Sequence, residues 1–108
     1  MSYSISFYSA TVKADIWSWP LGIRASYLGI TERMAEHGAN LGLPYTGAMG
    51  DGLFEIRARG PEGVGRAFFC TLVGQRIVIL HALIKKTQRT LPADLRIARR
   101  RLQELQHG

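Results

Sequence analysis

The fold is decided by residues 53–87, which are LFEIRARGPEGVGRAFFCTLVGQRIVILHALIKKT. Apolar and charged side chains alternate over 53–59, which predicts a strand with its glutamate and both arginines on one face. A glycine-rich turn follows, and the apolar runs 66–73 and 76–84 predict two more strands. The Gly-Gln pair between those runs is typical of a two-residue hairpin connection. This part of the chain is therefore expected to be the centre of an antiparallel sheet.

The rest of the chain supplies one more strand and the helices. A stripe of apolar side chains four, three and four residues apart predicts a helix over 21–37, and Gly38 is a natural residue to end it. The complete set of expected elements is a strand at 3–8, helices at 10–19 and 21–37, a loop at 39–50, the three strands above and a helix that opens near Pro92. A length of 108 residues is typical of a single domain, spanning 1–108.

Basic charge is concentrated in the second half of the chain. Residues 54–108 carry eleven basic and four acidic side chains, a net charge of +7, whereas residues 1–53 carry a net charge of −1. Charge distributed so unevenly indicates a polyanionic partner, and nucleic acid is the first candidate. A solvated basic surface without a partner is the alternative.

Two arginines are expected to converge at one end of the central hairpin. Arg57 and Arg66 lie on neighbouring antiparallel strands on either side of the turn. Their planar, forked side chains suit phosphate oxygens, and Lys85 and Lys86 follow at the end of the last strand. The cluster favours phosphate binding. The alternative is that one or more of these arginines pair with nearby glutamates, Glu55 or Glu62, on an exposed sheet.

His81 is the one histidine within a predicted strand, where strict alternation places it on the same face as Ile77, Ile79 and Leu83. Its ordinary pKa of about 6.5 suits proton transfer, but a hydrogen-bonded core histidine is the competing interpretation. No cluster of His, Cys, Asp or Glu has ligand spacing, so neither a metal nor another cofactor is expected. Cys70 lies within a strand-like run and is expected to be a packing residue.

Three motifs, in this order and spacing, resemble the phage-derived Gp49-like toxins of the HigB/RelE superfamily of type II toxin–antitoxin systems. They are GLFEIR at 52–57, RAFF at 66–69 after a glycine-rich turn, and ILHALIKKTQ at 79–88. The final helix, with Ala98 and Arg101 after Pro92, continues the likeness, which covers about residues 50–106. The first half is similar only in its two-helix segment.

The resemblance implies an α+β, RelE-like fold of order β-α-α-β-β-β-α, a small twisted, mostly antiparallel sheet with helices packed on one face. It implies a toxin that cleaves messenger RNA on the ribosome, without a metal, through attack of the RNA 2′-OH on the adjacent phosphate. The implied catalytic residues are Arg57 and Arg66 as phosphate ligands, Lys85 and Lys86 for charge stabilisation or proton transfer, and His81 as an acid or base. The other cations expected to bind RNA are Arg59, Arg89, Arg99 and Arg100.

The resemblance also implies a partner, a cognate helix-turn-helix antitoxin protein. Three positions depart from the related sequences, which often have an aromatic residue at Gly65, a tyrosine at Phe69 and a glycine at Ala82. Two other functions remain open, namely a non-catalytic nucleic-acid or ribosome-binding module, such as an inactive prophage remnant, and a structural phage protein with a basic face. Without a leader-like N-terminus or an apolar run of about 18 residues, the protein is expected to be cytoplasmic and to have no membrane partner.

Overall fold

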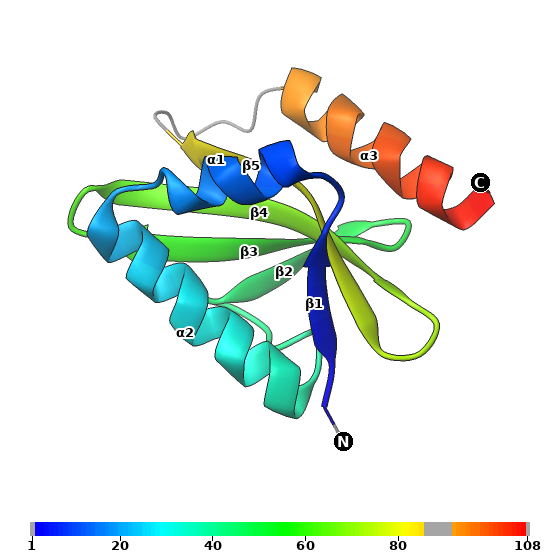
Figure 1. Cartoon of the computed structure of the whole chain (residues 1–108), viewed down its shortest axis with the longest axis horizontal. Helices are drawn as coiled ribbons and strands as arrows, with labels where there is room; N and C mark the ends of the chain where they lie inside the picture. Colours follow the sequence, from blue (N-terminus) through cyan, green and yellow to red (C-terminus); the bar gives the residue numbers. More distant parts are fainter. Residues whose placement is uncertain (1, 86–91, 108) are drawn as a thin grey trace.

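Five strands form one open sheet in the order β1-β5-β4-β3-β2 (Figure 1). The computed structural model describes residues 2–85 and 92–107. The elements are β1 (Ser4–Phe7), α1 (Ala10–Trp17), α2 (Leu21–His37), β2 (Thr46–Gly50), β3 (Leu53–Gly60), β4 (Gly63–Leu72), β5 (Arg76–Lys85) and α3 (Pro92–His107). Only β1 is parallel to its neighbour, β5, and the other three pairs are antiparallel, as a mostly antiparallel α+β fold requires.

The helices cover both faces of the sheet, so the expectation that they pack on one face is wrong. On one face, α1 and α2 bury a large apolar cluster that includes Ile23, Tyr27, Ile56 and Phe69. On the other, Ala98 and Leu102 of α3 pack with a smaller cluster that includes Leu53, Phe68, Cys70 and Leu80. The nearly continuous apolar run of β5 is typical of a strand covered on both faces, and its apolar side chains contribute to both clusters.

Helix α2 begins and ends where the sequence indicated. Its apolar stripe is buried against the sheet, and Gly38, with a φ of 107°, donates its N–H to the Met34 carbonyl. At the other end, the Gly22 N–H donates to the Glu62 carboxylate at 3.0 Å, which lowers the pKa of Glu62. A Cβ at Gly60 would lie 2.6 Å from the Ile23 nitrogen, so this close approach of helix and hairpin requires glycine.

Strand β2 is an addition to the expected elements, because residues 39–50 were expected to be a loop. It pairs with β3 from Thr46 opposite Ile56 to Gly50 opposite Leu53, with a bulge between Ala48 and Gly50. The turn residues Asp51 and Gly52 have φ values of 54° and 85°. Two glycines in a five-residue strand give it a weak intrinsic preference, so its pairing with β3 decides its conformation.

The hairpin between β4 and β5 is present, but its connection has three residues rather than two. Leu72 pairs with Arg76, which leaves Val73, Gly74 and Gln75 as the turn. Gly74 and Gln75 have positive φ values of 84° and 59°. The hairpin between β3 and β4 is tighter, because Gly60 pairs with Gly63 and β4 therefore begins earlier than expected.

Candidate functional site

On the sheet face that α3 covers, Arg57, Arg66 and Arg59 lie in neighbouring rows, next to the row of His81. The strand register sets the rows across β5, β4 and β3, which are His81–Phe68–Glu55, Leu83–Arg66–Arg57 and Lys85–Val64–Arg59. Neighbouring strands are about 5 Å apart, and alternate residues along a strand are about 7 Å apart. The predicted convergence of Arg57 and Arg66 is therefore confirmed, since they are direct cross-strand partners.

A buried carboxylate holds these two arginines together. The Glu55 side chain is fully buried, and its Oε1 accepts a hydrogen bond from Arg57 Nε at 2.6 Å. Its Oε2 accepts one from Arg66 Nε at 2.6 Å and another from Arg66 Nη2. Two guanidinium groups paired with one carboxylate have a net charge of about +1, and a net positive charge is what an anion-binding site requires.

The two arginines differ in their access to solvent. The Arg66 side chain is 5% exposed, whereas that of Arg57 is 38% exposed. Arg57 can therefore meet a phosphate directly. Arg66 contributes its charge from beneath the surface, where its guanidinium carbon also lies 5.3 Å from the centre of the Phe68 ring.

The cluster continues from Phe68 to α3. The ring of His81 is stacked on that of Phe68, with the ring planes 3° apart and the centres 6.4 Å apart. His81 Nε2 lies 2.7 Å from the Oδ1 of Asp94, in the first turn of α3. The chain of contacts from Arg57 through Glu55, Arg66 and Phe68 to His81 thus ends at the N-terminal end of this helix.

The predicted face of His81 is wrong. A bulge interrupts the pairing of β4 and β5, where Phe68 is opposite His81 and the next residue of β4 is opposite Ile79. The extra residue, Leu80, shifts the alternation, so His81 faces α3 together with Leu80 and Leu83 rather than with Ile79. The bulge therefore moves the histidine to the face that carries the arginines.

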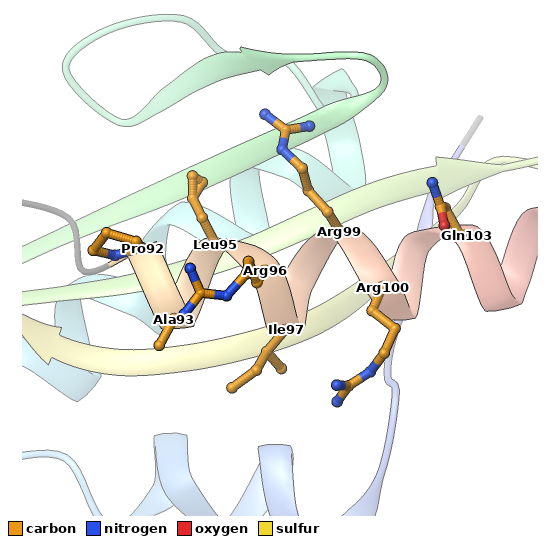
Figure 2. A pocket seen from close by; sticks show the side chains of 8 residues that line it. All are labelled: Pro92, Ala93, Leu95, Arg96, Ile97, Arg99, Arg100 and Gln103. Carbon is orange, nitrogen blue, oxygen red and sulfur yellow. The ribbon is translucent and has the colours of Figure 1, made fainter.

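Arginines of α3 have two distinct environments. Arg99 donates to the carbonyls of Met49 and Gly50, and Arg101 donates to the Leu80 carbonyl at 2.7 Å, with its guanidinium 4.6 Å from the Tyr8 ring centre. These contacts fasten the helix to the sheet. Arg96 and Arg100 are exposed, and together with Arg99 they line a groove along α3 (Figure 2).

The other predicted cations lie on β3 or, in the sequence, near the end of β5. Arg59 is exposed on β3, next to the Arg57 row. Lys85 pairs with Val64 through its backbone, while its side chain, Lys86 and Arg89 lie outside the described residues. From the sequence, Glu55 was expected only as an alternative partner of the arginines, and no role was expected for Asp94. For Asp94 the one available signal was an acid near the start of a helix.

The three departures from related sequences all lie on the α1 and α2 side of the sheet, away from the arginine cluster. A Cβ at Gly65 would lie 2.7 Å from a ring carbon of Trp19, which fills the space that a side chain at Gly65 would need. Phe69 is buried and stacked on Phe54, and Ala82 lies in the same apolar cluster. These departures are therefore changes of core packing and remove no group from the arginine face.

Among the described residues, no three His, Cys, Asp or Glu side chains are grouped as a metal site would need. No described helix is long and apolar enough to cross a membrane. Burial raises the pKa of the Cys70 thiol, as expected for a packing residue.

Comparisons with known proteins agree with this architecture. The chain is similar to one in the crystal structure of the archaeal RelE–RelB complex from Pyrococcus horikoshii, with a TM-score of 0.53 and 17% sequence identity over 80% of this chain and 98% of that chain. Comparison with curated protein sequences finds no significant match. The family model described as "Phage derived protein Gp49-like (DUF891)" matches residues 14–103. With a RelE-like fold and most of its length matched by that model, the chain belongs to the Gp49-like family of phage-derived proteins.

Proposed function

We propose that this protein is the toxin of a type II toxin–antitoxin system and acts, as a single unit over residues 1–108, as a metal-independent endoribonuclease on ribosome-bound messenger RNA. The observation that carries the proposal is the pair of arginines clamped on Glu55 beside His81, on the α3 side of a RelE-like sheet. Cleavage by the RNA's own 2′-OH needs a base, an acid and positive charge around the phosphate. We assign the proton-transfer role to His81 and the positive charge to Arg57 and Arg66 on this face.

Each residue has a role in the proposed reaction. Arg57, which is half-exposed, binds the scissile phosphate, and Arg66 supplies buried positive charge that stabilises the dianionic transition state. His81 transfers a proton, and Lys85 and Lys86 are proposed to stabilise charge or transfer the second proton. The exposed cations Arg59 and Arg100, with Arg89 and Arg99, are proposed to attract the RNA backbone.

The decisive experiment is to add the purified protein to translating ribosomes and to map the ends of the messenger RNA. We expect cuts that leave a 2′,3′-cyclic phosphate on one fragment and a 5′-hydroxyl on the other. The second candidate function is a non-catalytic RNA or ribosome-binding module, which is favoured by one observation: both arginines already pair with Glu55. Binding to ribosomes without any cleavage would support that function instead.

Binding to RNA is expected to weaken steeply as salt increases. Each phosphate that a basic side chain neutralises releases counterions, with a slope in log Kd against log salt of about 0.7 per contact for single strands. Three or four contacts would therefore weaken binding by roughly 15- to 50-fold between 50 and 200 mM salt. Fluorescence anisotropy with a labelled single-stranded RNA measures this dependence, and an affinity that stays constant over this range would contradict the basic-face proposal.

A small helix-turn-helix protein encoded beside this gene is expected to bind and neutralise the toxin. The RelE neighbour was crystallised as a complex with RelB, and the net charge of +6 here favours an acidic partner surface. Co-expression of the two products should restore growth, and they should copurify. A neighbouring product that neither binds nor protects would remove the toxin–antitoxin assignment and leave the basic binding module.

A further inference from the structure

The contact between His81 and Asp94 joins the sheet face to α3. His81 Nε2 lies 2.7 Å from Asp94 Oδ1, and the two side chains are only 16% and 17% exposed. Phe68, stacked in parallel on the imidazole, restricts the tilt of the ring. Both the direction and the plane of the ring are therefore held in place.

Geometry of this kind selects one tautomer of the neutral ring. A carboxylate only accepts hydrogen bonds, so the ring nitrogen that faces Asp94, Nε2, must carry a proton. The other nitrogen, Nδ1, then has a free lone pair and can accept a proton. A carboxylate that holds an imidazole in this way also stabilises the imidazolium formed when Nδ1 is protonated.

We propose that Asp94 is a positioning residue that holds His81 as the Nε2–H tautomer, so that Nδ1 serves as the general base of the RNA cleavage. The proposal rests on the proposed function and extends it. In the step, the 2′-OH proton moves to Nδ1, the 2′-oxygen forms a bond to phosphorus, and the bond from phosphorus to the 5′-oxygen breaks. The leaving 5′-oxygen takes a proton from water, the hydroxide so formed takes the proton back from Nδ1, and no electrons are gained or lost.

Contacts other than that of Asp94 keep α3 docked on the sheet. The effect of Asp94 on the His81 ring can therefore be tested separately from the docking of the helix. Arg99 and Arg101 donate to carbonyls of the sheet, and the Tyr8 hydroxyl donates to Glu104. Ala98 and Leu102 are buried against the sheet. Loss of the Asp94 carboxylate is therefore expected to release the His81 ring while the helix remains docked.

The first arm of the test is nitrogen-15 NMR of the imidazole rings. The samples carry Arg57→Ala, which removes the proposed substrate contact two strands away so that the protein can be produced without growth arrest. We expect His81 to show one Nε2–H proton, protected from solvent exchange and shifted downfield by the charged acceptor. Added Asp94→Ala should abolish that protected signal, and Asp94→Asn, which keeps the shape but not the charge, should weaken it.

The second arm measures cleavage in chains that keep Arg57. Asp94→Ala and Asp94→Asn are expected to lower the cleavage rate by about 10- to 100-fold, the range seen when the hydrogen-bonded partner of a metal-bound histidine is removed. The matched control is Tyr8→Phe, which removes another polar contact of α3 and keeps the ring beneath Arg101. Tyr8→Phe should leave the His81 signal and the cleavage rate unchanged.

The outcomes separate this proposal from the proposed function. If the unaltered chain cleaves RNA and folded Asp94 variants cleave it equally well, the positioning role is overturned and the function stands. A proton found on Nδ1, or an Nε2–H signal unaffected by both Asp94 variants, also overturns it. If the unaltered chain does not cleave RNA at all, the function fails and the catalytic use of the ring fails with it, whatever the NMR shows.

Discussion

Cells that express the Arg57→Ala variant alone are expected to keep growing, whereas expression of the unaltered chain alone should stop growth. Arg57 is the more exposed of the two clustered arginines, 38% against 5% for Arg66, and is therefore the one placed to meet a phosphate. Removing one donor aimed at developing negative charge lowers the rate by about 10²–10³-fold. Growth after induction and the cleavage rate of the purified variant measure this effect.

The matched control is Arg76→Ala, which removes an equal charge from the opposite end of β5. Arg76 is exposed and pairs across the sheet with Ser4 and Leu72, far from the arginine rows. This variant should arrest growth as the parent does. Arg66→Ala is also expected to relieve the arrest, with some loss of stability because Glu55 loses its buried partner. If Arg57→Ala and Arg66→Ala both stay folded and fully toxic, the proposed site is misplaced.

Glu55→Ala is expected to lower the free energy of unfolding by about 3–5 kcal/mol, the usual effect of removing one partner from a buried ion pair. The Glu55 side chain is fully buried, and the nearly buried Arg66 would be left beside Arg57 without the carboxylate between them. Two guanidinium groups in direct cross-strand register repel each other. Chemical denaturation followed by circular dichroism measures the loss.

Two further variants test whether the missing charge is the cause. Glu36→Ala removes a carboxylate that is 76% exposed and should change the free energy of unfolding by no more than about 0.5 kcal/mol. The double variant Glu55→Leu with Arg66→Met should be more stable than Glu55→Ala, because apolar side chains of similar size can replace a buried ion pair. A Glu55→Ala variant as stable as the parent would show that Glu55 does not offset the arginine charges.

The sequence was sufficient to predict the secondary structure that carries the site. The apolar stripe of α2, the alternation in β3 and the hairpins on either side of β4 depend on short-range periodicity and turn residues, which a single sequence displays. Because Arg57 and Arg66 flank a short turn, their cross-strand pairing follows from local chain geometry. The weak edge strand β2 was missed, since its glycines give no strand pattern and its pairing with β3 creates it.

The sequence by itself therefore determined the central hairpins, the basic half of the chain and the convergence of two arginines. Tertiary structure alone decided which groups meet those arginines. The bulge at Leu80 turns His81 toward α3, and the docking of α3 brings Asp94 to it from 13 residues further along the chain. Glu55 holds both arginines only when the pairing of β3 with β4 brings Arg66 to its carboxylate. Local periodicity indicates on which face of an ideal strand a side chain lies. Bulges, helix docking and the pairing of buried charges depend instead on contacts between different elements.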